Sequence, residues 1–384
     1  MKWRGCFVGD FVEAGCADIQ TGPFRTQLKA SDYVSDGTPV INVRNIGFGS
    51  LRLDKLEYIG ERTTDRLSVH LLRDNDIVFG RKGAVDRHLF VTKELENWMQ
   101  GSDCIRLRFE TEEVCPRFVS YAFLRNEHQK WMLTQSGNKA TMASLNQDII
   151  KRISLNLPSR QVQEEIVAIL SAYDSLIENN LRRMKLLEES ARLLYREWFV
   201  RLRFPGHEHT RIVNGVPEGW ERKQVGDVLT LNYGKALKEL DRIEGPIPVY
   251  GSSGVVGTHN EALVKGPGII VGRKGNVGSV YWIESDFWPI DTVYFIESFQ
   301  SNYFLLHNLQ HQSFQNSDGA VPGLNRNYAY SLPVLFPRQM IRLQFEQTVT
   351  PIYEQLLKLR TMNHKLKTVR DLLLPKLMSG EITV

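Results

Sequence analysis

Two long stretches of the chain carry apolar residues at alternating steps of four and three. The first stretch places them at Ile166, Leu170, Tyr173, Ile177, Leu181, Met184, Leu187, Ala191, Leu194 and Trp198. The second places them at Phe345, Val349, Ile352, Leu356, Leu359, Leu366, Val369, Leu373 and Leu377. This spacing is typical of a coiled-coil seam and predicts two long α-helices. Because Pro375 lies within the second stretch, we expect that helix to end or kink there.

Each predicted helix has an apolar stripe that another surface must cover. Forty residues of helix span about 60 Å at 1.5 Å per residue, so a lone helix would leave a long stripe in water. The two helices can cover each other as an antiparallel coiled coil, which would give the chain pseudo-two-fold symmetry. The residues expected at this helix pairing are Ile166, Leu170, Tyr173, Ile177, Met184, Leu187, Leu194, Val349, Ile352, Leu356, Leu366 and Leu373.

The segments that precede the long helices have the pattern of short strands. Apolar or alternating runs lie between turn residues at 40–43, 77–79, 105–109, 269–271, 280–283 and 292–296. Short helical patterns such as 118–124 follow them. We therefore predict an α+β domain ahead of each long helix.

Several short motifs occur twice in the same order. Trp3 precedes a Val-Gly-Asp triplet by four residues, and Trp220 does the same. The other repeated motifs are Gly-Arg-Lys-Gly at 80–83 and 272–275, Leu-Asn at 145–146 and 324–325, and an apolar residue before proline at 157–158 and 336–337. Because their spacings differ only by loop-sized insertions, the sequence predicts a tandem duplication of roughly 190 residues.

The duplication suggests boundaries along the chain. We expect a first domain at 1–157, a long helix at 158–203, a linker with the second domain at 204–335, and a long helix at 336–384. The linker, at 204–219, is rich in proline and glycine. It contains His207, Glu208 and His209, which we do not interpret as a metal site because a polar linker supplies no further ligands.

Composition allows a nucleic-acid partner and predicts a cytoplasmic protein. The 384 residues include 48 lysines and arginines against 44 aspartates and glutamates, a formal net charge of +4. The cysteines have neither a Cys-x-x-Cys pair nor zinc spacing, so we interpret them as reduced thiols: Cys6, Cys16, Cys104 and Cys115. There is no run of 18 apolar residues, and 1–5 is too polar for a signal peptide.

The sequence lacks the motifs of common catalytic sites. Gly234-Lys235 is followed by Ala236 and has no upstream glycine at P-loop spacing. His-Glu-x-x-His, Gly-x-Ser-x-Gly and Gly-x-Gly-x-x-Gly after a strand are missing, as is the Asn/Asp-Pro-Pro-aromatic motif of amino-methylating DNA methyltransferases. We therefore expect a chain that is not catalytic by itself, without a metal or cofactor of its own.

Polar loops supply candidate DNA contacts instead. Each Gly-Arg-Lys-Gly segment places two cations on a turn after a strand, where glycines permit close approach to a phosphate. Other loops carry residue types that pair with base edges in the major groove. The candidates are Arg44, Asn45, Arg81, Lys82, Asn138, Lys139, Tyr250, Ser252, Ser253, Arg273, Lys274, Asn276, Asn325 and Arg326. Each loop taken alone is also consistent with an ordinary solvated turn.

Five segments carry a likeness to a known family. They are 187–195, 217–220, 248–254, 271–278 and 369–382. The most specific reads Val-Arg-Asp-Leu-Leu-Leu-Pro-Lys-Leu-Met-Ser-Gly-Glu-Ile, at 369–382, and 187–195 echoes it in the first half. On these segments the chain resembles, essentially from end to end, the specificity subunits of type I restriction–modification systems.

The resemblance implies a DNA-recognition scaffold. Two target-recognition domains would each read one half of a bipartite DNA site, and two antiparallel helices would set the spacer between the halves. It also implies two methyltransferase subunits, which bind S-adenosylmethionine and methylate adenine N6, and two motor/nuclease subunits, which use ATP and Mg²⁺. Because Gly83 is followed by Ala-Val-Asp and Gly275 by Asn-Val-Gly, we expect the two halves to read different sequences.

Other interpretations stay open at this point. The chain could be a similar DNA-binding scaffold of another defence system, or a structural protein whose paired helices hold other proteins. It could also be a free-standing DNA-modifying enzyme, against which the missing motifs count.

Overall fold

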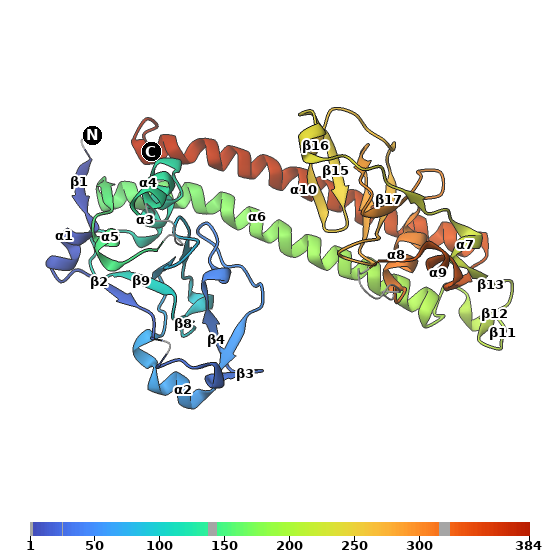
Figure 1. Cartoon of the computed structure of the whole chain (residues 1–384), viewed down its shortest axis with the longest axis horizontal. Coiled ribbons are helices and arrows are strands. Elements are labelled where there is room, and N and C mark those ends of the chain that lie inside the picture. The colour runs from blue at the N-terminus through green and yellow to red at the C-terminus, as the bar shows by residue number, and fades with distance from the viewer. Residues whose placement is uncertain (1–2, 25, 137–143, 315–322) are drawn as a thin grey trace. The chain divides into compact units, whose positions relative to one another are not determined.

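The computed structural model describes residues 3–24, 26–136, 144–314 and 323–384. The chain divides into two compact units. Unit 1 comprises Met1–Asn179 and Asn363–Val384, and unit 2 comprises Asn180–Met362. Both long helices, α6 (Arg160–Tyr195) and α10 (Gln339–Ser379), contribute to each unit (Figure 1). The predicted domain boundaries at 157, 203 and 335 follow the repeated sequence motifs, whereas the two units are defined by their internal contacts. The predicted boundaries therefore stay a prediction.

Unit 1 contains two four-stranded sheets and a separate strand pair. The first sheet has the antiparallel order β2-β9-β6-β7, and the second has the order β3-β5-β4-β8, in which β4 and β8 run parallel. Strand β1 pairs with β10, the strand that leads into α6. The strands are β1 (Arg4–Phe7), β2 (Ala17–Thr21), β3 (Tyr33–Val34), β4 (Thr38–Ile41), β5 (Glu57–Ile59), β6 (Ile77–Gly80), β7 (His88–Phe90), β8 (Met99–Gln100), β9 (Cys104–Phe109) and β10 (Ser154–Leu157).

Unit 1 also contains short α-helices. They are α1 (Val8–Glu13), α2 (Glu61–Arg66), α3 (Pro116–Phe123), α4 (Asn126–Ser136) and α5 (Gln147–Lys151). Helix α3 buries Phe118, Val119 and Phe123 against the first sheet. The same core takes in Ile166 and Leu170 of α6 and Leu377 of α10, so the globular part and the helices share one apolar interior.

Unit 2 repeats this order of elements. Sheet β14-β20-β17-β18 corresponds to the first sheet of unit 1, and β16-β15-β19 corresponds to the second, again with one parallel pair. Strand β13 pairs with β21 ahead of α10, as β1 pairs with β10. The elements are β11 (Ile212–Val213), β12 (Val216–Pro217), β13 (Glu221–Gln224), α7 (Val225–Val228), β14 (Asn232–Tyr233), β15 (Ile247–Gly251), β16 (Gly254–His259), β17 (Gly268–Gly272), β18 (Val280–Ile283), β19 (Trp288–Pro289), β20 (Val293–Ile296), α8 (Tyr303–His311), α9 (Arg326–Ser331) and β21 (Pro333–Phe336). The predicted α+β duplication is confirmed.

The repeated motifs are helix caps and tight turns. In the Val-Gly-Asp triplets, Asp10 Oδ2 accepts the N–H of Phe7 at 2.7 Å, and Asp227 Oδ2 accepts that of Gln224 at 2.8 Å. In the Leu-Asn pairs, Asn146 and Asn325 cap the helices that follow them. These residues recur because each copy must satisfy the same free N–H groups at the same helix starts.

The long helices pair antiparallel within each unit. In unit 1, Nδ2 of Asn363 on α10 donates to the carbonyl of Ile177 on α6 at 3.3 Å, and Arg370, further along α10, bonds Asp174, earlier on α6. In unit 2, Arg360 bonds Glu188 at 2.9 Å, and Phe345, earlier on α10, packs on Tyr195, later on α6. The opposite order of contacts confirms the predicted antiparallel pairing.

Most of the predicted seam is buried. Ile166, Leu170, Ile177, Val349 and Leu356 are fully enclosed. The remaining predicted pairing residues are partly buried, namely Tyr173, Met184, Leu187, Leu194, Ile352, Leu366 and Leu373.

Two details of the helix prediction are wrong. Leu181 and Val369 follow the seam pattern, but both side chains are close to half-exposed, so they lie outside the buried seam. Of the expected end or kink at Pro375, the end is contradicted, because α10 continues to Ser379. A proline so near the end of a helix removes only one hydrogen bond, and buried Leu374 and Leu377 hold the last turn in the core.

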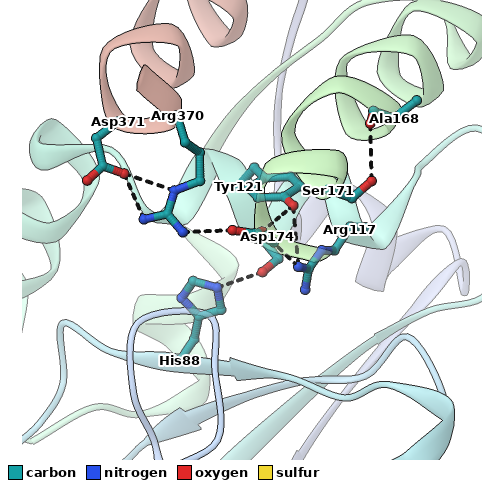
Figure 2. A network of polar contacts seen from close by, with 9 residues as sticks. His88, Arg117, Tyr121, Ala168, Ser171, Asp174, Arg370 and Asp371 are labelled. Carbon is teal, nitrogen blue, oxygen red and sulfur yellow. Dashed lines mark hydrogen bonds and ion pairs between the residues drawn. The ribbon is translucent and has the colours of Figure 1, made fainter. Parts of the chain in front are cut away.

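A polar network joins the globular part of unit 1 to both helices. Asp174 of α6 accepts hydrogen bonds from Tyr121 Oη at 2.6 Å and Arg117 Nη2 at 3.2 Å, both from α3. Arg370 of α10 donates to its other oxygen at 2.7 Å (Figure 2). Burial raises the pKa of Tyr121 well above its usual value, so its hydroxyl remains a donor. One carboxylate thus holds three elements together.

The segment predicted as a linker contains ordered turns. His207, Glu208 and His209 form one turn of 3₁₀ helix, and β11 and β12 form a two-stranded hairpin after it. Phe204 and Trp220 pack on each other at 4.8 Å and are buried in unit 2. Among the helices that the structure describes, none has the length and apolar character needed to cross a bilayer.

Candidate nucleic-acid interface

The two Gly-Arg-Lys-Gly loops have the same construction. Each follows a central strand, β6 or β17, and the carbonyl of its arginine accepts the N–H of the leucine in the Leu-Asn pair. These bonds are 2.7 Å from Leu145 to Arg81 and 2.8 Å from Leu324 to Arg273. A side chain on Gly272 would meet the carbonyl oxygen of Asn276 at 2.2 Å, which explains the first glycine. The fold therefore brings together two candidate segments that lie some fifty or more residues apart in the sequence, such as 272–275 and 323–326 in unit 2.

The lysine of each loop already has a counter-ion. Lys82 Nζ lies 3.6 Å from Asp103, and Lys274 Nζ lies 3.6 Å from Asp291. All four side chains are one-third to one-half exposed, so these pairs are weak and open to exchange for a phosphate. Both lysines keep their place as candidate contacts, but part of their charge is neutralised.

The arginines of the two loops have different surroundings. Arg81 and Lys82 line a hollow of about 400 Å³ together with Phe24, which is exposed. The guanidinium group of Arg273 lies over the ring of Tyr233, 5.0 Å from its centroid, and that of Arg326 lies over the same ring at 4.8 Å. Tyr233 was not among the predicted site residues. No local pattern indicates it, because its contacts come from two other elements; the strand register places Thr21 at the corresponding position of unit 1.

The loop at 44–45 does not present its asparagine to DNA. Asn45 is fully buried, and its Nδ2 donates to the carbonyl oxygens of Arg52 and Asp54 at 2.9 and 3.0 Å. Its Oδ1 accepts the N–H of Asn42. The prediction that Asn45 reads a base is therefore wrong, because every polar atom of this side chain holds its own loop. Arg44 is exposed and forms an ion pair of 2.6 Å with Glu57.

The hairpin turn at 250–253 packs against the second Gly-Arg-Lys-Gly loop. Ser252 is buried, its Oγ accepts the N–H of Asn276, and its carbonyl oxygen accepts from Ser279 Oγ at 2.6 Å. Ser253 and the side chain of Asn276 remain exposed, whereas Tyr250 is half-buried. The structure thus places Ser253 and Asn276 at the surface of one loop cluster, with Ser252 as the residue that joins the two loops.

The remaining candidates divide into two groups. Asn325 uses its Oδ1 to accept the N–H groups of Asn327 and Tyr328, so its role is to cap α9, and Arg326 follows it at the surface. Asn138 and Lys139 lie outside the described residues. In unit 2 the surface cluster therefore consists of Tyr233, Ser253, Arg273, Asn276 and Arg326.

The described residues offer little to metal or acid–base chemistry. Within the four described ranges, no three His, Cys, Asp or Glu side chains are grouped so that they could hold a metal ion. Burial lowers the pKa of His88 to about 3 and that of His307 to about 4, so both imidazoles are neutral at pH 7. Both lie inside the protein rather than in the surface loops. The arrangement supplies cations, amides and aromatic rings for binding.

Comparison with known proteins assigns a family to both halves. The family described as the type I restriction modification DNA specificity domain matches residues 17–189 and 217–328. The specificity subunit of the type I restriction enzyme MjaIX from Methanocaldococcus jannaschii is 25% identical over 303 residues, which cover 71% of this chain and 70% of the relative. The specificity subunit of the type I restriction enzyme HindI from Haemophilus influenzae is 22% identical over 404 residues, which cover 81% of this chain and 87% of the relative.

A solved structure has the same fold. The S subunit of a type I restriction–modification system from M. genitalium superposes on this chain with a TM-score of 0.59 and 16% sequence identity. The superposition covers 98% of this chain and 96% of the M. genitalium chain. Since the matched family segments include most of both globular parts and most of α6, the resemblance covers the elements that build the loop clusters. The chain belongs to the family of type I restriction–modification DNA specificity proteins.

Proposed function

We propose that this chain is the sequence-specific DNA-recognition subunit of a type I restriction–modification complex. The observation that carries the proposal is the duplication: each unit presents one loop cluster built on the same strands, as a reader of a bipartite site requires. Each cluster contains a Gly-Arg-Lys-Gly loop held against a Leu-Asn turn, at 80–83 and at 272–275. One domain then reads one half-site.

The two half-sites differ in sequence. Unit 2 presents Tyr233, Asn276 and Arg326 at its loop cluster, whereas the matching positions in unit 1 are Thr21, Ala84 and Gln147. Hydrogen-bonding groups of different type and length pair with different base edges. An asymmetric target follows from this difference.

The long helices set the spacing between the half-sites and hold the partner subunits. A helix of 36 residues such as α6 spans about 54 Å, more than one turn of B-DNA at roughly 34 Å. In unit 2, Leu186 and Leu193 of α6 and Val200 of the π-helical turn at Arg196–Val200 lie exposed at intervals of seven, away from the buried seam. An apolar stripe with this period fits a protein partner that packs along the helix.

The partners supply the chemistry. Two methyltransferase subunits bind S-adenosylmethionine and methylate adenine N6, and two motor/nuclease subunits use ATP and Mg²⁺ to translocate and cleave DNA. This chain contributes recognition and is not catalytic by itself. Its place of action is the cytoplasm, where the genome is methylated.

Methylome sequencing tests the proposal. A host that expresses the complex is compared with the same host in which this chain alone has been deleted. We expect a bipartite adenine-methylated motif with two unlike halves in the first host, and its complete loss in the second. If no such motif disappears on deletion, the chain does not specify a methylation target.

Exchange of domains supplies a second readout. A chain in which 221–336 is replaced by the corresponding segment of another family member should change one half of the methylated motif and leave the other half unchanged. A change in both halves, or in neither, would contradict the assignment of one half-site to each domain.

A further inference from the structure

Two arginines of unit 2 share one tyrosine ring. Arg273 comes from the loop after β17, Arg326 is the first residue of α9, and Tyr233 ends β14. The guanidinium carbons lie 5.0 and 4.8 Å from the ring centroid, so the two charges are at most about 10 Å apart, close to the Debye length in 0.1 M salt. Tyr233 is 48% exposed, which leaves this cluster open at the surface.

The backbone holds the cluster in place. Arg273 Nη1 donates to the carbonyl oxygen of Asp291 at 3.1 Å, and its guanidinium also lies 5.8 Å from the ring of Tyr294. Tyr294 is buried beside Tyr233, at 5.1 Å between ring centroids, and its hydroxyl donates to the carbonyl oxygen of Leu324. Arg326 extends over a second ring, that of Tyr330, whose hydroxyl accepts the N–H of Leu231. Both guanidinium groups are therefore positioned before any ligand arrives.

The charge on the two arginines is not neutralised. Among the residues that the structure describes, neither Arg273 nor Arg326 forms an ion pair with a carboxylate, whereas Arg44, Lys82 and Lys274 each do. Two fixed cations at this separation repel each other, and an anion placed between them relieves the repulsion. A guanidinium group stacked on a ring keeps its N–H edge available, and that edge matches a phosphate.

At the corresponding positions, the part of unit 1 that the structure describes has no such cluster. Thr21 replaces the tyrosine and Gln147 replaces the second arginine, and Gln147 Nε2 donates to Thr21 Oγ1 at 3.2 Å. Arg81 is the one cation that remains of the three residues. The two neutral side chains satisfy each other, so nothing in this pair requires an anion.

We propose that Tyr233, Arg273 and Arg326 form a preformed clamp for a DNA phosphate, which anchors unit 2 to the backbone beside its half-site and has no counterpart among the described residues of unit 1. The proposal rests on the proposed function, because it takes duplex DNA as the ligand. A phosphate contact fixes the register of the protein on DNA without reading sequence. Unit 2 then carries a larger share of the salt-dependent affinity than unit 1.

The test measures DNA binding by the full chain with its methyltransferase subunits, as a function of salt. Two duplexes are used, one with the methylated motif found by methylome sequencing and one of equal length with that motif scrambled. Arg326→Gln, the residue that unit 1 has, and Arg273→Gln should each weaken binding to both duplexes about eightfold at 0.1 M salt and lower the salt slope by about 1. The preference for the target duplex should not change.

Three further variants separate charge from position. Arg326→Lys retains the charge and should keep most of the salt slope. Tyr233→Thr retains both arginines but removes the ring that positions them. It should weaken binding to both duplexes less than Arg326→Gln does. Lys274→Gln is the comparison within the same loop, because Asp291 neutralises part of the charge of this lysine, and its effect on the slope should be smaller than that of either arginine variant.

Two outcomes would overturn the clamp. In the first, both arginine variants bind both duplexes with unchanged affinity and slope while thermal melting shows a normal fold. In the second, only the target duplex is weakened, which would mean that these arginines read a base. A wild-type complex that shows no preference for the target duplex would instead contradict the proposed function and is distinguishable from both.

Discussion

The joint between globular part and long helices is built with opposite chemistry in the two units. The key position lies sixteen residues after the proline that precedes each helix, where unit 1 has Asp174 and unit 2 has Tyr353. In unit 1, Asp174 binds Arg117 and Tyr121 of α3 and Arg370 of α10. The joint is an ion network around a single carboxylate.

In unit 2 the same position belongs to an aromatic cluster. The rings of Tyr303 and Tyr353 stack at 4.1 Å with an angle of 17° between their planes, and Trp282 packs on Tyr303 at 4.5 Å. The hydroxyl of Tyr353 lies 3.2 Å from His307 Nε2. Arg370 of α10 corresponds in the duplication to Ala191 of α6. Ala191 belongs to unit 2 and is fully buried. Here apolar contact, not charge, joins the elements.

The difference shows that the duplicated fold requires a firm joint but not a particular interaction. A partly buried ion network is stable only while every partner is present, because a lone buried charge is costly. An aromatic cluster loses stability in proportion to the contacts removed. The two joints should therefore respond differently to substitution, acid and salt.

Tyr353→Ala should have the largest effect on stability. Removal of a buried ring from the cluster is expected to cost about 3–4 kcal/mol in the free energy of unfolding, most of it in unit 2. Hydrogen exchange of 303–311 against 116–123 locates the loss. Tyr353→Phe, which removes only the bond to His307, should cost about 1 kcal/mol. Equal losses for the two variants would mean that the ring contacts contribute little.

Asp174→Ala should have the next largest effect, in unit 1. It leaves Arg117 and Arg370, each about one-quarter exposed, without their shared carboxylate, at an expected cost of about 2–3 kcal/mol. Faster hydrogen exchange in 116–123, with 303–311 unchanged, is the expected pattern. The control is Asp371→Asn, since Asp371 binds Arg370 from a largely exposed position and should matter by less than about 1 kcal/mol. If Asp174→Ala left the free energy of unfolding unchanged, this network would not be what holds the joint.

Acid should weaken both units through buried histidines, which are His88 and His128 in unit 1 and His307 in unit 2; burial lowers the pKa of His128 to about 4. Burial lowers the pKa of His88 to about 3, with the nearby His128 and Arg117 adding to the effect. Burial also lowers the pKa of His307 to about 4, and Arg192 acts in the same direction. Since the unfolded chain binds protons below pH 6.5 and these folded sites do not, their stabilising contribution is complete above pH 6.5 and is lost as pH falls towards 4.

The expected loss is about 2 kcal/mol per histidine between pH 6.5 and 5, from about 1.4 kcal/mol per pH unit. Urea unfolding at several pH values measures it. His88→Gln and His128→Gln should each remove part of the pH dependence of unit 1, and His307→Gln should flatten that of unit 2. Unchanged slopes in these variants would assign the acid sensitivity to other groups.

The sequence predicted the parts of the fold that depend on interactions within one segment of the chain, such as the buried face of a helix and the cap at its start. The seam period predicted α6 and α10 because a helix shows its buried face directly in the spacing of its apolar residues. The repeated Asp10/Asp227 and Asn146/Asn325 were informative for the same reason, because each caps a helix start within three residues. Such requirements are visible without knowledge of the tertiary structure.

The parts that sequence could not predict depend on partners far along the chain. Asp174 meets Arg117 and Arg370, 57 and 196 residues away, and no pattern within one segment indicates those pairs. Asn45 was misread because an asparagine in a polar loop looks available until its burial is known. Tyr233 was missed because its ring has meaning only beside two arginines from other elements.

Salt should produce the smallest effect and the sharpest contrast between the joints. The Debye length falls from about 10 Å at 0.1 M to about 3 Å at 1 M salt, close to the 2.7 and 3.2 Å bonds of Asp174. Because the network is about one-quarter exposed, we expect unit 1 to lose only about 0.5 kcal/mol, seen as roughly twofold faster exchange in 116–123. The aromatic joint carries no ion pair at Tyr353, so exchange in 303–311 should not accelerate. Asp174→Asn should abolish the salt response of unit 1, and a response that persists in this variant would place its origin outside the network.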